Sequence, residues 1–208
     1  MSSKILRGVE QYYSHKVSEY GNSSLGVDWN SKESQYLRFE QLSKVIASKE
    51  KFSVLDYGCG YGEYVNYLTL NFSEGFFKYT GYDVSEKMIE TGKVLFANNV
   101  DASLTKQHPD RKFDYTIASG IFNVKLDLAN NEEWLAYIIR TLDTINNVSE
   151  KGFAFIALTK YSDKEFMKDY LYYADPLFLF NYCKENFSRN VALLHDYELY
   201  EFTLIVRK

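Results

Sequence analysis

Three glycines spaced two residues apart carry the strongest chemical signal in this sequence. In residues 53–64 (SVLDYGCGYGEY) an apolar run leads directly into a turn formed by Gly58, Gly60 and Gly62. Glycine adopts positive φ readily and lets the backbone approach a bound molecule with no Cβ in between. A helix is expected to follow at once, and its first N–H groups are free to donate. The pattern predicts a turn that holds a nucleoside-containing ligand.

Two acidic residues beside this turn indicate which ligand it favours. Glu63 stands where a G-x-G-x-x-G dinucleotide fingerprint would have its third glycine, and Asp56 precedes the first glycine by two residues. Carboxylates repel a pyrophosphate and tolerate a cation. S-adenosylmethionine carries a sulfonium and an ammonium group and no phosphate, so the charges favour it over NAD. An NAD-type oxidoreductase is the alternative enzyme class.

A third acid, Asp83, ends the segment KYTGYD downstream of the glycines. A carboxylate is an acceptor with two oxygens, so it can hold both hydroxyls of a ribose from the end of a neighbouring strand. Asp83 can alternatively assist the cap of a helix whose N-cap is expected at Ser85. The combination of strand, glycine turn, helix, strand and acid predicts a nucleoside site.

Alternating strand and helix signals place these residues in an α/β fold. Strands are expected over residues 52–57, 78–83, 102–105, 113–119 and 152–159, and helices over residues 33–47, 63–70, 86–98 and 132–147. This alternation favours a parallel sheet with helices on both faces. The strand-like residues 190–195 and 199–206 are too close together for a crossover helix, so they are expected to form an antiparallel hairpin.

The motifs VLDYGCGYGEY, YTGYDVSEKMI and FDYTIASGIF, with the terminal hairpin, resemble the class I, seven-strand S-adenosylmethionine-dependent methyltransferases. The resemblance covers residues 50–208 approximately. It implies a doubly wound, mostly parallel seven-stranded sheet with a C-terminal antiparallel hairpin. We therefore expect one domain over residues 1–208, with residues 51–208 as a Rossmann-like core and residues 1–50 as a helical extension or lid.

The same resemblance assigns the cofactor contacts. The three glycines would pass under the methionine and ribose portions of S-adenosylmethionine, and Asp83 would hold the ribose. Val84 would lie against the adenine. The residues expected near the sulfonium leave the fourth strand and are Ser119, Gly120 and Ile121.

The expected lid adds two residues to the cofactor site. Trp29 would cover the cofactor, because a segment that precedes the core folds over it in many relatives. Arg38 would pair with the methionine carboxylate, which is the one anionic group of the cofactor. The alternative for Arg38 is a position on a solvated helix face.

The acceptor side offers fewer signals, because the cofactor supplies the reactivity and no universal catalytic residue is required. His195, beside Asp196 at the expected hairpin turn, is a candidate base. Asn123 follows the fourth strand and is a candidate hydrogen-bond partner of the acceptor. The alternatives are that Asp196 only initiates the turn and that Asn123 only caps a loop.

The aromatic segment YLYYADPLFLFNYC, residues 170–183, precedes the sixth strand. Insertions at this place commonly form the wall of the acceptor pocket in the family, and Tyr172 and Tyr173 are the first candidates. The alternative is a helix that packs on the sheet.

Composition limits the partners. The 208 residues carry a formal net charge of −4 and no block of Lys and Arg with interleaved aromatics, which argues against a nucleic-acid methyltransferase. Cys59 and Cys183 offer neither a disulfide framework nor metal-ligand spacing, so no metal is expected and a reducing compartment is favoured. The start lacks the apolar run of a signal peptide, and no segment approaches the roughly 18 apolar residues of a membrane span.

The predicted activity is methyl transfer from S-adenosylmethionine to a small-molecule acceptor, at oxygen, by in-line displacement in a cytoplasmic monomer or homodimer. The strings GVDWNS, SGIFNVK, LYYADP and HDY are also similar to small bacterial methyltransferases of surface-carbohydrate or other secondary biosynthesis. A protein that binds S-adenosylmethionine without catalysis is a further alternative.

Overall fold

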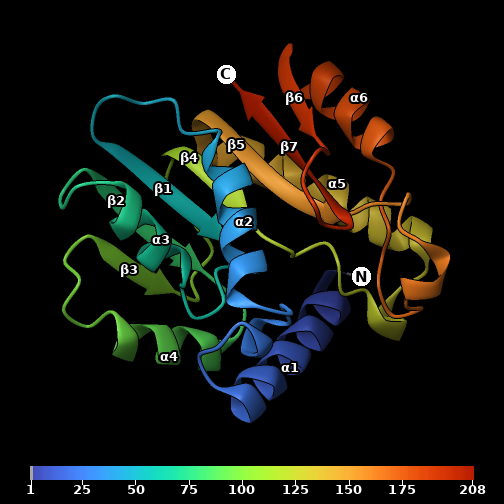
Figure 1. The fold of residues 1–208 in the computed structure, drawn as a ribbon, viewed down its shortest axis with the longest axis horizontal. Helices are drawn as coiled ribbons and strands as arrows, with labels where there is room; N and C mark the ends of the chain where they lie inside the picture. Colours follow the sequence, from blue (N-terminus) through green and yellow to red (C-terminus); the bar gives the residue numbers. More distant parts are fainter. Residues whose placement is uncertain (1) are drawn as a thin grey trace.

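A seven-stranded sheet forms the centre of the computed structural model, which describes residues 2–208 (Figure 1). Its strand order is β3-β2-β1-β4-β5-β7-β6, with β7 antiparallel to both neighbours and the other adjacent pairs parallel. The strands are β1 (Phe52–Tyr57), β2 (Phe77–Tyr82), β3 (Ala102–Thr105), β4 (Phe113–Ala118), β5 (Ser149–Leu158), β6 (Asn190–Leu194) and β7 (Glu201–Arg207). The predicted mostly parallel sheet with a terminal antiparallel hairpin is confirmed.

Helices cover both faces of this sheet (Figure 1). The α-helices are α1 (Ser2–Tyr20), α2 (Lys32–Ser43), α3 (Tyr64–Asn71), α4 (Glu86–Leu95), α5 (Asn131–Val148) and α6 (Pro176–Asn186), and the short 3-10 helices are η1 (Leu25–Val27), η2 (Leu126–Leu128) and η3 (Lys164–Phe166). One apolar core lies between the sheet and α2, α3 and α4. The other lies between the sheet and α5 and α6, with Ile5 of α1 added.

The helix starts follow from local capping residues. The Ser31 hydroxyl accepts from the Ser34 N–H at 3.1 Å at the start of α2, and the Ser85 hydroxyl accepts from the Met88 N–H at 3.2 Å at the start of α4. Each satisfies one of the free donors of a first turn, so the N-cap predicted at Ser85 is confirmed. The helix predicted over residues 33–47 ends earlier, at Ser43. The chain leaves the helix there and buries Val45 in the core.

The terminal hairpin has a longer connection than the predicted strands, 190–195 and 199–206, would leave. β6 ends at Leu194 and β7 starts at Glu201, so residues 195–200 rather than three residues connect them. A hydrogen bond of 2.8 Å between the Tyr197 and Thr203 hydroxyls folds the connection back on β7. Glu201 pairs with Leu158, the last residue of β5. The hairpin therefore turns at the carboxyl edge of the parallel strands, the edge that also carries the glycine turn.

Candidate functional site

The glycine turn has the backbone geometry that its sequence predicts. Gly58, Gly60 and Gly62 have φ values of 82°, 56° and 90°. The N–H groups of Gly58 and Cys59 donate to the Tyr82 carbonyl at 2.7 and 3.0 Å, which fixes the turn against the end of β2.

Two of these glycines also leave no space for a side chain. A Cβ on Gly58 would stand 2.2 Å from Ile121 Cγ2, and one on Gly60 would stand 2.8 Å from Val27 Cγ1. The backbone can therefore form the floor of a cavity only because these residues are glycine. Gly62 differs, because its missing Cβ faces Leu104 of β3 at 3.0 Å, away from the cavity wall.

Asp83 connects the glycine turn to the start of α4. Its Oδ2 accepts from the Gly60 N–H at 2.9 Å, and its Oδ1 accepts from the Ser85 N–H at 2.8 Å. Burial raises the pKa of this carboxyl, and the backbone donors oppose that shift. The capping contact considered in the sequence is thus present. Each carboxylate oxygen keeps a further acceptor position, which is what two ribose hydroxyls require.

Asp56 is the second carboxyl below the turn. It is buried at the end of β1, where the Tyr79 hydroxyl donates to its Oδ2 at 2.9 Å. Burial raises its pKa to about 7, the hydrogen bond from Tyr79 lowers it, and the charge of Asp83 raises it further. The carboxyl therefore changes charge near neutral pH.

A cavity of about 320 Å³ opens at this edge of the sheet. Its wall contains nine of the residues predicted to bind the cofactor: Trp29, Asp56, Gly58, Gly60, Asp83, Val84, Ser119, Gly120 and Ile121. Segments far apart in the sequence thus converge on one space. Gly62 and Arg38 lie outside this wall.

The turn after β4 supplies an unpaired polar atom. The Ser119 hydroxyl is buried and has no hydrogen-bond partner. Gly120 follows with φ of 78°, and a Cβ there would stand 2.4 Å from Trp29 Cη2. An unpartnered hydroxyl, a backbone floor without side chains and two carboxyls fit a nucleoside with hydroxyl and cationic groups, which is the chemistry of S-adenosylmethionine.

The wall also contains residues that the sequence reasoning missed. α1 contributes Leu6, Val9 and Tyr13, and α5 contributes Tyr137, Arg140, Thr141 and Thr144. Both sets have helical spacing, so each forms one stripe on its helix, and that periodicity was the available signal. His108 is exposed and still reaches the wall, with its ring beside Tyr57 and Tyr82.

Asn123 is buried, and both ends of its amide have partners. Its Oδ1 accepts from the Leu158 N–H at 3.1 Å, and its Nδ2 donates to Glu201 Oε1 at 3.1 Å. The backbone carbonyl of Asn123 accepts from the Tyr172 N–H at 2.8 Å. The residue therefore joins the ends of β5 and β7 to the aromatic segment, and it lies outside the cavity wall.

His195 and Tyr173, two further candidates for contact with the acceptor, also lie outside the wall. His195 is exposed directly after β6, with its ring 6.1 Å from those of Tyr161 and Phe202. The Tyr173 hydroxyl accepts from the Lys168 N–H at 2.9 Å in the loop before α6. The structure does not bring these residues and Asn123 together around one point. Their contact with an acceptor stays a prediction.

Arg38 is buried and pairs with another residue of the chain, and its contact with the methionine carboxylate stays a prediction. Its side chain is 9% exposed, so it does not lie on a solvated helix face, and its Nε donates to Glu201 Oε2 at 2.6 Å. The guanidinium lies behind Trp29, with Cζ 3.9 Å from the ring centroid. Glu201 is the partner that sequence reasoning missed, because 163 positions separate the two residues.

Within residues 2–208, no group of three or more His, Cys, Asp and Glu side chains is placed to hold a metal ion. None of the helices that the structure describes combines the length and apolar character needed to span a bilayer.

Comparison with known proteins gives concordant matches. A family model described as "Methyltransferase domain" matches residues 54–144. A Mycobacterium tuberculosis protein named "Putative methyltransferase Rv1506c" is 47% identical over 167 residues, which cover 79% of this chain and 98% of that protein.

Solved structures agree in fold. The N-methyltransferase NodS from Bradyrhizobium japonicum, in complex with S-adenosyl-L-homocysteine, has a TM-score of 0.62 at 10% identity, over 96% of this chain and 97% of that one. Magnesium protoporphyrin IX methyltransferase from Synechocystis, with bound S-adenosylmethionine, has a TM-score of 0.59 at 18% identity, over 84% and 80% of the two chains.

Proposed function

This chain belongs to the class I S-adenosylmethionine-dependent methyltransferases, and we propose that it transfers the methyl group to an oxygen atom of a small-molecule acceptor by in-line displacement. The observation that carries the proposal is the cavity at the carboxyl edge of the sheet, where the glycine turn, Asp83 and the turn after β4 share one wall. An NAD-type ligand is disfavoured there, because Asp56 and Glu63 also contribute to that wall.

On the donor side, S-adenosylmethionine supplies an electrophilic methyl group on a sulfonium. We assign the glycine turn to the floor under its methionine and ribose portions. Asp83 accepts the ribose hydroxyls with the acceptor positions that Gly60 and Ser85 leave open. Val84 packs on the adenine. Asp56 contributes negative charge beneath the cationic end of the cofactor.

Near the reacting centre, the turn after β4 and Trp29 form adjoining parts of the cavity wall. The buried Ser119 hydroxyl gains a hydrogen-bond partner when the cofactor binds, which removes the cost of leaving it unpaired. Ile121 and Trp29 exclude water from the path of the methyl group, and displacement proceeds more readily in a dry, aligned site. α1, η1 and α2 act as the lid, because Leu6, Val27 and Trp29 reach the cavity from them or from the loop between them.

The acceptor is a small molecule in this proposal, and a cavity of about 320 Å³ supports this because it lies in the range of small-ligand pockets. Oxygen is supported by the similarity of short strings in the chain to methyltransferases of surface-carbohydrate biosynthesis, since sugars present hydroxyl groups. The net charge of −4 supports the same assignment, because a nucleic-acid substrate favours a basic surface.

The test combines donor binding with an acceptor panel. Calorimetry is expected to detect one site per chain for S-adenosylhomocysteine, with no binding of NAD. Release of S-adenosylhomocysteine is then measured against hydroxylated sugars and phenols, with amines, DNA and RNA as comparison substrates. Turnover on a hydroxyl compound supports the proposal. Turnover only on amines or nucleic acid refutes the acceptor assignment, and absence of donor binding refutes the donor site.

A further inference from the structure

Trp29 forms one wall of the cavity and rests against a buried cation on its far side. Its ring stands so close to the turn after β4 that a Cβ on Gly120 would lie 2.4 Å from Cη2. Behind the ring, the Arg38 guanidinium lies 3.9 Å from the ring centroid. Such a cation–π contact is strongest where water is excluded, and Arg38 is only 7% exposed.

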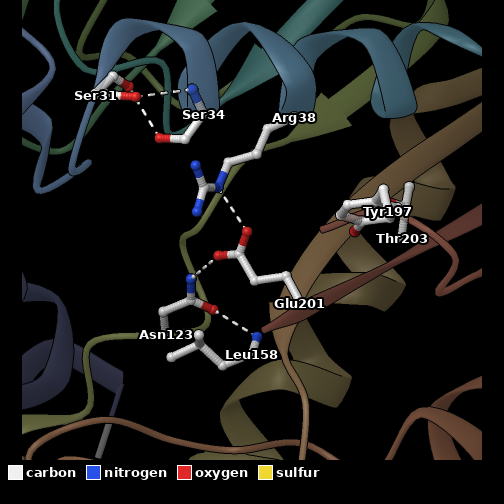
Figure 2. A network of polar contacts seen from close by, with 8 residues as sticks. All are labelled: Ser31, Ser34, Arg38, Asn123, Leu158, Tyr197, Glu201 and Thr203. Atoms are coloured by element: carbon white, nitrogen blue, oxygen red, sulfur yellow. Dashed lines mark hydrogen bonds and ion pairs between the residues drawn. The ribbon is translucent and has the colours of Figure 1, made fainter. Parts of the chain in front are cut away.

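Glu201 holds this guanidinium through a single short contact (Figure 2). Its Oε2 accepts from Arg38 Nε at 2.6 Å, and its Oε1 accepts from Asn123 Nδ2 at 3.1 Å. Arg38 Nη1 is buried and has no hydrogen-bond partner. The orientation of the guanidinium plane therefore depends on Glu201 at one end and on the face of Trp29.

Asn123 in turn fixes Glu201 in place. Figure 2 shows the amide between Glu201 and Leu158, with the Leu158 N–H donating to Asn123 Oδ1 at 3.1 Å. Because Leu158 and Glu201 are paired residues of β5 and β7, the carboxylate projects from a rigid part of the sheet. A continuous chain of contacts thus runs from the sheet through the ion pair to Trp29.

Stability alone does not explain why the charges of Arg38 and Glu201 are buried. Removing two charges from water costs free energy that their attraction offsets only partly, and apolar residues of similar volume often serve a core equally well. A planar guanidinium held at Nε by a carboxylate offers something that apolar packing lacks, namely a fixed plane on which an aromatic ring can stack. The position of Trp29 is what this arrangement determines.

We propose that Glu201 is a positioning residue, which orients Arg38 so that Trp29 is held as the wall of the cofactor cavity. This inference rests on the proposed function, because it treats the cavity beside Trp29 as the binding site of the cofactor. Because Glu201 does not reach the cavity wall, the proposal predicts that it affects cofactor affinity only through Trp29.

The experiment is a double-mutant cycle on S-adenosylhomocysteine affinity, measured by calorimetry with the full chain. Glu201→Gln and Trp29→Leu are each expected to raise Kd about tenfold, as the loss of one charge-assisted or aromatic contact does. The double variant is expected to lie within twofold of Trp29→Leu alone. If the double variant instead raised Kd about a hundredfold, the proposal would be overturned, because Glu201 would then act independently of Trp29.

Tryptophan emission gives a second readout that general destabilisation does not mimic. The chain has two tryptophans. The part of the ligand-induced emission change that disappears in Trp29→Leu therefore comes from Trp29. Glu201→Gln is expected to lose most of that same part at saturating ligand. An unchanged signal would show that Trp29 keeps its position without the carboxylate.

Two further variants separate positioning from folding. Arg38→Lys retains a cation for Glu201 but loses the planar face, so affinity is expected to fall about tenfold while the melting temperature stays close to that of the wild type. Unchanged affinity in Arg38→Lys overturns the proposal even if Glu201→Gln does not fold. Asp114→Asn is the matched control, because this carboxylate also has an ion-pair partner, Lys151 at 2.7 Å, at the opposite edge of the sheet.

The same measurements distinguish this inference from the function on which it rests. Wild-type protein that does not bind S-adenosylhomocysteine contradicts the donor site. Wild-type binding together with equal affinity of Glu201→Gln contradicts only the positioning role.

Discussion

The proposed donor half of the site, around the glycine turn, and the proposed acceptor half, around the ends of β5 and β7, are built in different ways. In the donor half the floor consists of backbone and of side chains that directly follow β1, β2 and β4. In the acceptor half, Glu201 binds both Asn123 and Arg38, across long sequence separations. Local motifs can therefore define the first half, whereas the second depends on contacts that only the folded chain creates.

The largest loss of cofactor affinity is expected from a substitution in the donor half, and it tests the contrast between the two halves. Asp83→Ala removes the acceptor for the ribose hydroxyls and leaves the Gly60 and Ser85 N–H groups without their partner. Affinity for S-adenosylhomocysteine is expected to fall about 100-fold, as the loss of two charge-assisted hydrogen bonds implies. Calorimetry tests this directly. The control is Asp101→Asn, which perturbs a carboxylate that pairs with Lys78 at 2.7 Å, outside the cavity wall. Equal losses in the two variants would contradict the ribose assignment.

A smaller effect is expected from Gly120→Ala. The added Cβ would lie 2.4 Å from Trp29 Cη2, and the alanine would also have to adopt a φ of 78°. Displacement of Trp29 is expected to weaken S-adenosylhomocysteine binding about tenfold, in addition to a stability loss of about 1 kcal/mol from the backbone.

Gly75→Ala is the matched control for the backbone strain that Gly120→Ala introduces. Gly75 has a φ of 70°, and a Cβ there would have no neighbour within 4 Å. It is expected to lose similar stability and to keep wild-type affinity. Weakened binding in both variants would show that strain, and not the wall formed by Trp29, limits the affinity.

A pH dependence is expected from Asp56. Its pKa of about 7 in the folded protein means that the carboxyl becomes charged as the pH rises through neutrality. S-adenosylmethionine carries one more positive charge than S-adenosylhomocysteine, so the preference for the methyl donor is expected to grow about fivefold between about pH 6 and 8. Competition binding across this range measures it. Asp56→Asn should remove the slope, and a slope that persists in this variant would assign it to another group.

The same shift predicts how Asp56 affects stability. Because the folded pKa lies above the ordinary aspartate value of 3.8, the folded state binds the proton more tightly than the unfolded state. The unfavourable contribution of Asp56 is therefore absent at pH below 3.8 and develops as the pH rises to about 7. Denaturant titrations should show Asp56→Asn gaining most, relative to the wild type, above about pH 7.

The smallest effect is expected from His195→Ala. The side chain is exposed beyond the cavity wall, so S-adenosylhomocysteine affinity should change less than twofold and stability by less than about 0.5 kcal/mol. Turnover on an identified acceptor is the informative measurement. A large fall in kcat at unchanged donor affinity would place the acceptor at the hairpin, whereas altered donor affinity would contradict the separation of the two halves.

The sequence by itself determined most of the sheet and of the donor half. Strand–helix alternation, the spacing of Gly58, Gly60 and Gly62, and the acid after β2 all depend on interactions within a few residues. Local φ, ψ and capping preferences operate over that range. The predicted strand ends were correct to within a few residues for the same reason, and the narrow spacing of the last two strands required a hairpin.

The tertiary structure alone decided the partners of Arg38 and Asn123 and the edge at which the hairpin turns. These outcomes depend on the register of β7 against β5, which places Glu201 beside Leu158. Register follows from how complete faces of the sheet pack, and no local pattern near Arg38 encodes a carboxylate that lies 163 positions away. The cavity wall contributed by α1 and α5 has the same origin. Their stripes were visible in the sequence, but only packing against the sheet directed them to the cofactor edge.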